Sequence, residues 1–135
     1  MKLFVDTGAW FALQHKNDRH HSAAKAFTKR FSQEPTLLYT TDYIVDETVT
    51  LLRFKASHRH AVAFLDFISD SANVEKPQIT SDLLKRAETI FRRYSDKPWS
   101  YTDCVSFAFM DDLGLRDAFS FDANFAQYGK TLHPN

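Results

Sequence analysis

The stretch from Ser100 to Phe125, which reads SYTDCVSFAFMDDLGLRDAFSFDANF, most constrains what this chain can fold into. Its pattern predicts a short apolar helix over Thr102–Leu113 that ends at Gly114, a residue favoured just past a helix C-terminus. A short apolar strand is expected over Ala118–Phe121. A helix, a short loop and a strand in this order are typical of layered α/β folds, in which ligands bind outside the carboxyl ends of the strands.

Two acids in this stretch occupy positions that matter in such folds. Asp103 stands at the start of the predicted helix, and Asp122 follows the predicted strand. Taken alone, an Asp at a strand end is most often a turn former or a helix N-cap, because Asp favours both positions. A functional role therefore requires further acids that converge from elsewhere in the chain.

The composition indicates one folded domain over residues 1–135. Hydrophobic residues make up 44% of the sequence and include 13 Phe, which is ample material for a core at this length. No apolar run approaches the roughly 18 residues of a membrane helix, and the opening MKLFVDTGAW lacks the pattern of a signal peptide. The single cysteine excludes an intramolecular disulfide, so we expect a cytoplasmic protein.

Charge is unevenly distributed along the chain, although 17 basic and 17 acidic residues balance. Basic residues gather in segments 53–60 and 85–97, whereas segment 103–124 holds five Asp and one Arg. Solvated helix faces explain either basic segment by itself. Beside an acidic site, the same segments would suit a polyanion such as nucleic acid.

The start of the chain repeats the pattern of an apolar strand that ends in a carboxylate. LFVD at residues 3–6 has the same form as FSFD at residues 119–122. A strand is therefore expected over Lys2–Val5, ended by Asp6. Three more strands are expected over Leu37–Thr40, Val74–Ile79 and Thr131–His133. Pro77 confines the second of these three to a sheet edge or bends it.

Between the strands, apolar residues at helical spacing predict helices. The expected ranges are Thr7–Gln14, Arg19–Phe31, Tyr43–Lys55, His58–Ser71 and Ser81–Tyr94, and a turn follows over Asn124–Tyr128. Polar residues that favour N-cap positions precede or begin four of these helices. They are Asp18, Asp42, Ser57 and Ser81.

Glu47 shares a face of its predicted helix with Ile44 and Leu51. Its carboxylate is thus expected on, or at the rim of, a core-facing stripe, where a charge must be paired or bound to a metal. An edge position paired with Arg or Lys explains Glu47 equally well when it is considered alone. The neighbouring Asp46 is expected to be more exposed.

Four acids therefore stand out for their positions: Asp6, Glu47, Asp103 and Asp122. If the strands are parallel and adjacent, these four can meet at one end of the sheet. Two carboxylates about 4 Å apart repel by about 1 kcal/mol in water and about 4 kcal/mol at an effective dielectric near 20. A hard divalent cation relieves such repulsion. Because no His or Cys stands at a suitable place, Mg²⁺ or Mn²⁺ is favoured over Zn²⁺.

The segments LFVDTGAW, YIVDETVTLL and YTDCVSFAFMDDLGLRDAFSFDANF, with the pattern Asp18-x-x-His21-x-x-Ala24, resemble the PIN-domain nucleases. Within that family they look like the VapC-type toxins of prokaryotic toxin–antitoxin systems. The resemblance extends from Lys2 to about Gly129 and implies a three-layer α/β/α fold with a central parallel sheet of four to five short strands. It also implies that the four acids hold Mg²⁺ or Mn²⁺, supported by the hydroxyls of Thr7 and Thr102.

The resemblance further implies a metal-dependent endoribonuclease that leaves 5′-phosphate and 3′-hydroxyl ends, has a cognate antitoxin and commonly forms a homodimer. Cations held by carboxylates can activate water in a phosphodiester displacement, so no side-chain base is needed. Since an acidic site repels RNA, basic residues must hold the strand. The candidates are Arg53, Lys55, Arg59, Arg86, Arg92 and Arg93. Trp10, Trp99 and Tyr101 are candidates for base stacking, with burial in the core as the favoured expectation.

Three other functions stay open at this point. One is a housekeeping RNA-processing nuclease of the PIN family, and another is a PIN-fold interaction module without catalysis, although four intact acids argue against it. The third is a Mg²⁺-dependent phosphohydrolase with Asp6 as nucleophile. That class typically has a second Asp two residues further on, where this chain has Gly8.

Overall fold

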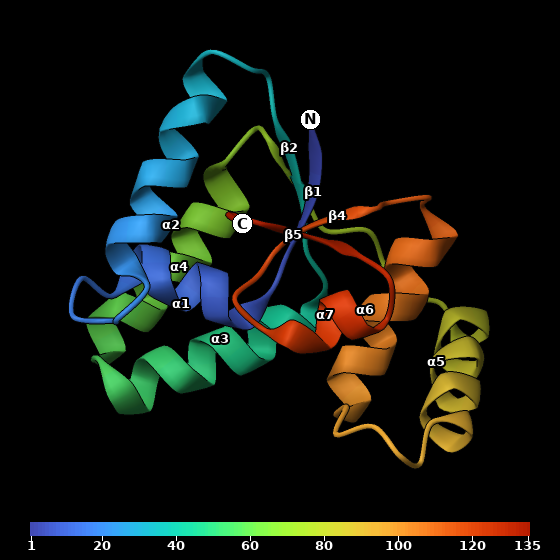
Figure 1. The fold of residues 1–135 in the computed structure, drawn as a ribbon. Coiled ribbons are helices and arrows are strands. Elements are labelled where there is room, and N and C mark those ends of the chain that lie inside the picture. Colours follow the sequence, from blue (N-terminus) through green and yellow to red (C-terminus); the bar gives the residue numbers. More distant parts are fainter.

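Five parallel strands form the centre of the computed structural model, which describes residues 1–135 (Figure 1). Their order in the sheet is β3-β2-β1-β4-β5, and every neighbouring pair is parallel. The direction of winding reverses at β1, so the crevice between β1 and β4 is the switch point where open α/β sheets bind ligands. The strands are β1 (Lys2–Val5), β2 (Leu37–Tyr39), β3 (Val74–Glu75), β4 (Asp117–Phe119) and β5 (Thr131–His133).

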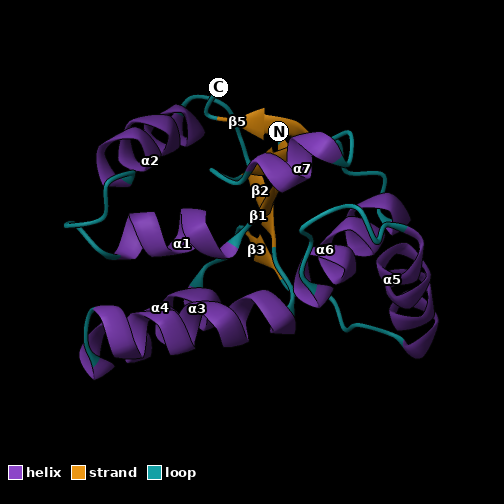
Figure 2. Cartoon of the chain, turned by 60° about the horizontal axis from the view of Figure 1, so that its bottom comes forward, coloured by secondary structure: helices purple, strands orange, loops and turns teal.

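Helices cover both faces of the sheet and complete the three layers that were predicted. Figure 2 shows helices α1 to α4 on one side of the sheet and α5 and α6 on the other. None of the helices is both long enough and apolar enough to cross a membrane. The helices are α1 (Thr7–Gln14), α2 (His21–Thr28), the 3-10 helix η1 (Lys29–Ser32), α3 (Asp42–Lys55), α4 (His58–Asp70), α5 (Ser81–Arg93), α6 (Tyr101–Asp112) and α7 (Ala123–Gln127).

The core is built on β1 and α6. Residues 3–5 of β1 and 104–110 of α6 are all buried, as expected of a parallel sheet whose two faces are covered by helices. The ring of Phe4 lies 5.8 Å from those of Phe109 and Phe125, measured between centroids. Trp10 is fully buried and its Nε1 donates a hydrogen bond to Thr40. Trp10 is therefore a core residue, as favoured from the sequence.

Three of the predicted helix caps were wrong by one or two residues. Thr41 caps α3 and Thr80 caps α5, because each Thr hydroxyl accepts a hydrogen bond from a backbone N–H three residues later. Asp42 and Ser81 are instead the first residues of these helices. Asp18 stands two residues before the N-cap of α2, where its carboxylate accepts the N–H of His20. Ser57 caps α4 as predicted.

Three strands are shorter than predicted, and β2 loses only its last expected residue, Thr40. β3 comprises only Val74–Glu75 and lies at the sheet edge, since the nearby Pro77 cannot donate a ladder hydrogen bond. β4 ends at Phe119, so two residues separate it from Asp122. The segment expected as a turn over residues 124–128 forms α7, with Asp122 as its N-cap.

Candidate active site

The four acids singled out from the sequence line a single cavity at the carboxyl end of the sheet. Asp6 follows β1, Asp122 precedes α7, Asp103 stands in the first turn of α6, and Glu47 stands on α3. The cavity has a volume of about 580 Å³. Its other lining residues are Thr7, Gly8, Arg19, His20, Ser100, Phe121 and Ala123. The structure thus brings the four acids together, whereas none of them indicates a functional site by itself.

Asp6 is the most buried of the four acids, with 8% of its surface exposed. Its carboxylate accepts a hydrogen bond of 3.1 Å from the Ser120 hydroxyl. Burial raises the pKa of Asp6 to about 7, and the negative charges of Asp103 and Asp122 act in the same direction. Hydrogen bonds from the Thr7 N–H and from Ser120 oppose this rise in the pKa. Carboxylates that raise one another's pKa form a site where a cation is stabilised.

Asp122 is the N-cap of α7 and Asp103 is the third helical residue in the capping box of α6, and these end-of-helix hydrogen bonds fix both at the cavity. The Asp103 carboxylate accepts the Ser100 N–H at 3.0 Å and the Asn124 side-chain amide at 3.1 Å. The Ser100 hydroxyl accepts the Asp103 N–H in return, which completes a capping box. Asp122 accepts the Asn124 N–H at 2.9 Å. Helix capping, the explanation given above for a lone Asp at a strand end, therefore applies to Asp122, which also converges with the other three acids at the cavity.

Glu47 lies at the exposed rim of the cavity and not on the core-facing stripe of α3. The buried residues of that stripe are Ile44, Thr48 and Leu52. Glu47 is one position before Thr48, so it is turned about 100° away from the stripe. The Thr7 hydroxyl donates a hydrogen bond of 2.8 Å to Glu47 Oε1. This contact joins α1 to α3 and directs the carboxylate along the cavity rim.

The structure adds polar residues that were not singled out from the sequence. Ser120 is buried, and its hydroxyl contacts both the Asp6 carboxylate and the Asp122 N–H. Thr102 does not line the cavity, whereas Ser100 does. The spacing Ser100-x-x-Asp103 is a capping-box pattern that could have identified Ser100. Ser120 carries no comparable local signal, because its role depends on the pairing of β1 with β4.

Arg19 is the sole Lys or Arg that lines the cavity. It forms no ion pair with the acids, and its Nε donates a hydrogen bond of 3.1 Å to His20 Nε2. The His20 ring stacks on Phe121 with 4.2 Å between centroids and 5° between planes. Neither Arg19 nor His20 was selected from the sequence as a site residue, because their position depends on how the loop before α2 folds against residues 120–122.

The six basic residues predicted to hold RNA all lie outside this cavity. Arg53 and Lys55 end α3 and Arg59 begins α4, all exposed. Arg86 is paired with Asp112 at 2.8 Å. On α5, Arg93 lies over the Tyr94 ring, and Arg92 lines a second cavity described below. Their role in RNA binding stays a prediction.

The donor atoms of the cavity fit a hard divalent cation. All four acids supply carboxylate oxygens, and Thr7 and Ser100 supply hydroxyls. In the present arrangement no three acidic, His or Cys side chains are close enough to surround one metal ion. Mg²⁺ commonly binds through one or two carboxylates and keeps several waters, so such a spacing suits it better than it suits Zn²⁺, which takes three or four close protein ligands.

Comparison with known proteins identifies the family. The PIN domain model matches residues 3–131. The chain belongs to the PIN domain family. It is 34% identical over 127 residues to the 23S rRNA-specific endonuclease VapC20 of Mycobacterium tuberculosis, which covers 94% of both proteins. It is also 29% identical over 128 residues to a VapC ribonuclease of Archaeoglobus fulgidus, covering 93% of this chain and 80% of that protein.

Solved structures support the same assignment. The crystal structure of M. tuberculosis VapC20, a sarcin–ricin loop cleaving toxin, matches with a TM-score of 0.86 and 32% identity over 96% of each chain. A chain of the VapBC2 complex from Rickettsia felis, bound to promoter DNA, matches with a TM-score of 0.73 at 7% identity, which shows the fold alone. The predicted PIN fold and VapC-type endoribonuclease family are therefore confirmed.

Within this PIN domain, Glu47 and Asp46 provide a test of which face of α3 serves the site. Glu47→Gln is expected to lower kcat/KM for RNA cleavage by about 10- to 100-fold, the scale found when groups that support a metal site are removed. Asp46→Asn should change it by less than about twofold, because Asp46 is exposed and does not line the cavity. Equal losses in the two variants would show that the assigned face of α3 is wrong.

Proposed function

We propose that this chain is a Mg²⁺- or Mn²⁺-dependent endoribonuclease and the toxin of a toxin–antitoxin pair. The observation that carries the proposal is the gathering of Asp6, Glu47, Asp103 and Asp122 in one cavity at the sheet switch point. The named relatives are ribonucleases. These four acids would hold the cation, one or two of them directly and the others through its water ligands, and the bound cation would lower the pKa of a water molecule and offset negative charge on the phosphate.

The protein's own contribution is to fix the carboxylates before the substrate arrives. Ser120 holds Asp6, Ser100 and Asn124 hold Asp103, and Thr7 holds Glu47. Each hydrogen bond restricts a side chain that would otherwise have to be ordered during the reaction, which lowers the entropic part of the barrier. The acids need no side-chain base beside them, because the nucleophile would be generated from water.

Arg19 is proposed to contact a phosphate of the RNA at the edge of the acidic cavity. Its guanidinium lines the cavity, makes no ion pair, and is positioned through Nε by His20. A hydrogen bond to a charged group contributes about 1.5–3 kcal/mol, so Arg19→Ala should lower kcat/KM by about 10- to 100-fold. It should also weaken the salt dependence of RNA binding by the amount that one phosphate contact contributes.

Lys16→Ala is the matched control for Arg19→Ala. Lys16 is exposed in the same connection between α1 and α2 and does not line the cavity. Its removal changes the net charge by the same amount but should alter kcat/KM by less than about twofold. Similar losses in both variants would show a general effect of charge and would contradict a specific phosphate contact.

The proposed partners follow from the relatives and from the surface of α4. Because the relative VapC20 of M. tuberculosis is named for 23S rRNA, ribosomal RNA is the first substrate to test. An inhibitor that offers an Arg or Lys side chain would pair with the carboxylates. Val62, Leu65 and Phe67 on α4 are exposed apolar side chains, against which an amphipathic antitoxin helix can pack. We further propose a cytoplasmic homodimer.

Cleavage of RNA by the purified chain tests this function directly. Mn²⁺ or Mg²⁺ should support cleavage and excess EDTA should stop it, whereas full activity in EDTA would contradict the metal requirement. Expression of the chain alone should slow growth, and co-expression of a neighbouring antitoxin gene should restore it. Cleavage without growth arrest would favour an RNA-processing nuclease. Hydrolysis of a small aryl phosphate but not of RNA would favour the phosphohydrolase.

A further inference from the structure

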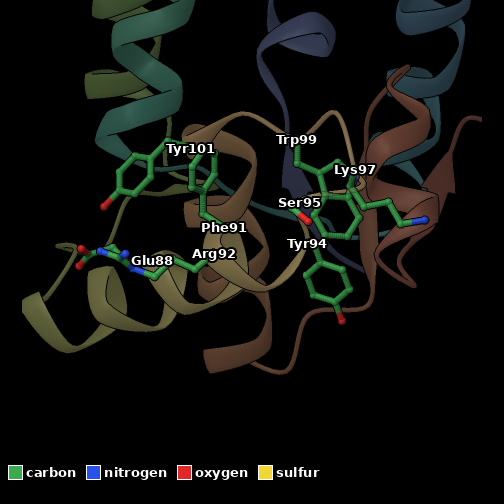
Figure 3. Close-up of a pocket in the computed structure, with 8 residues that line it drawn as sticks. All are labelled: Glu88, Phe91, Arg92, Tyr94, Ser95, Lys97, Trp99 and Tyr101. Carbon is green, nitrogen blue, oxygen red and sulfur yellow. The ribbon is translucent and has the colours of Figure 1, made fainter.

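A second cavity, of about 540 Å³, lies between the end of α5 and the start of α6 (Figure 3). Half of its lining is aromatic and two of its residues are cationic, in contrast to the acidic cavity. Figure 3 shows Phe91 and Tyr101 on one side and Tyr94 and Trp99 on the other. The lining residues are Glu88, Phe91, Arg92, Tyr94, Ser95, Lys97, Trp99 and Tyr101.

The aromatic rings form two corners with open faces. Phe91 and Tyr101 lie 6.2 Å apart at 73°, and Tyr94 and Trp99 lie 4.9 Å apart at 50°. Phe91 is 49% exposed and Tyr101 is 38% exposed, so both can accept a further ring. Trp99 is nearly buried, and its Nε1 donates a hydrogen bond of 3.1 Å to Gln127. A fixed wall beside two open aromatic faces suits a planar, stacking ligand.

The cations of this cavity have no protein partner. Arg92 and Lys97 form no ion pair, whereas Arg86 on the same helix is paired with Asp112 at 2.8 Å. Glu88 is the only acid in the lining. Free cations beside exposed aromatic rings are the combination by which proteins hold single-stranded nucleic acid, since phosphates pair with the cations and bases stack on the rings.

The two cavities meet along one short segment of the chain. Trp99 and Tyr101 line the aromatic cavity, and Ser100 between them lines the acidic cavity. Consecutive Cα atoms are about 3.8 Å apart, so the cavities flank the start of α6. An RNA strand with one phosphate among the carboxylates can therefore place a nearby base against Phe91 and Tyr101.

The charges around this cavity favour RNA over a second copy of the chain. Phe91 is the one large apolar side chain that α5 exposes, and its exposed neighbours on the helix include Glu88, Arg92 and Arg93. The buried centres of protein interfaces are depleted in charged residues. The exposed face of α4 is more apolar and better suited to a protein partner.

We propose that the aromatic cavity binds an unpaired nucleotide of the RNA substrate. The base stacks on Phe91 and Tyr101, and Arg92 and Lys97 pair with the adjoining phosphates. This inference rests on the proposed ribonuclease function and adds a substrate requirement to it. The RNA must present at least one unpaired nucleotide close to the cleaved bond, because a base held in a duplex cannot enter the cavity.

Binding of a short single-stranded oligoribonucleotide that carries 2-aminopurine tests the proposal in the Asp6→Asn background, where cleavage cannot interfere. Phe91→Ala should weaken binding by about 5- to 100-fold and reduce quenching of the probe, since one base–aromatic stack has an effect of that size. Phe91→Trp should retain binding. A plot of the log of the binding constant against the log of the salt concentration has a negative slope, and Arg92→Ala should make that slope shallower by about 0.7.

Leu113→Ala is the matched control, because Leu113 is 43% exposed at the end of α6, outside both cavities, and it should bind RNA as the parent does. Tyr101→Ala provides a second variant on a different helix, and circular dichroism verifies that both aromatic variants fold. Undiminished affinity in both would overturn the proposal. A changed oligomeric state by light scattering with unchanged RNA affinity would also overturn it and assign the surface to protein association. Absence of RNA binding by the Asp6→Asn parent would overturn it too, while metal-dependent cleavage by the native chain is a separate measurement of the function.

Discussion

Asp6→Asn is expected to reduce RNA cleavage by at least about 100-fold, because removal of even an outer partner of a metal site costs about 10- to 100-fold. Asp6 is the only one of the four acids that is nearly buried, and it directly follows the central strand β1. Asn keeps the shape of the side chain and can still accept the Ser120 hydrogen bond, so the loss would report the missing charge. Single-turnover cleavage of RNA in saturating Mn²⁺ is the measurement.

The same substitution separates catalysis from binding in the cell. If growth arrest depends on cleavage, Asp6→Asn expressed at the level of the native chain should be harmless. A variant that stays as toxic as its parent would favour the interaction module without catalysis. Asp111→Asn is a suitable control, because Asp111 near the end of α6 pairs with Lys130 and does not line the cavity. It should leave both cleavage and growth arrest nearly unchanged.

The sequence predicted those parts of the site that depend on local pattern. An apolar run followed by an acid identified β1 with Asp6, because a strand and the residue after it are neighbours in the chain. The ends of parallel strands meet at one edge of a sheet, so the convergence of Asp6 with Asp122 could also be predicted. The positions of Glu47 and Asp103 on their predicted helices added two further candidates, and the family resemblance implied that all four hold a metal ion.

The remaining parts depend on tertiary contacts that leave no local pattern. Ser120 supports Asp6 only because β4 pairs beside β1. Arg19 lines the cavity because His20 next to it stacks on Phe121, which lies more than a hundred positions away. Glu47 was expected on or beside the core stripe, and a difference of one residue in helix phase placed it at the exposed rim. Small errors in phase are enough to exchange a buried position for an exposed one.

Asp6 is also expected to make the metal-free protein less stable as the pH rises. In the unfolded chain its pKa has the ordinary value of 3.8, and burial in the folded chain raises it to about 7. Below about pH 4 the carboxyl is protonated in both states and has no effect on folding. Between about pH 4 and pH 7 the unfolded chain releases a proton that the folded chain keeps, so unfolding becomes more favourable as the pH increases.

Above about pH 7 both states are ionised and the full penalty applies. This penalty on the free energy of unfolding is about 1.4 kcal/mol for each pH unit between the two pKa values, and so at most about 4 kcal/mol. Because Asn does not titrate, the free energy of unfolding of Asp6→Asn minus that of the parent should be up to about 4 kcal/mol larger at pH 8 than at pH 4. Mn²⁺ should narrow this gap at pH 8 by binding only the parent tightly.

Urea unfolding of parent and variant in EDTA, at pH 4 and at pH 8, measures this difference. Asp46→Asn is the control, since Asp46 is exposed on α3 and its replacement should shift the free energy of unfolding by less than about 0.5 kcal/mol at either pH. An Asp6→Asn stability difference that stays the same at both pH values would show that Asp6 carries no buried charge. A difference that grows with pH, and shrinks when Mn²⁺ is added, would mean that the carboxylates needed for cleavage destabilise the metal-free fold, because the cavity that brings them together also removes Asp6 from water.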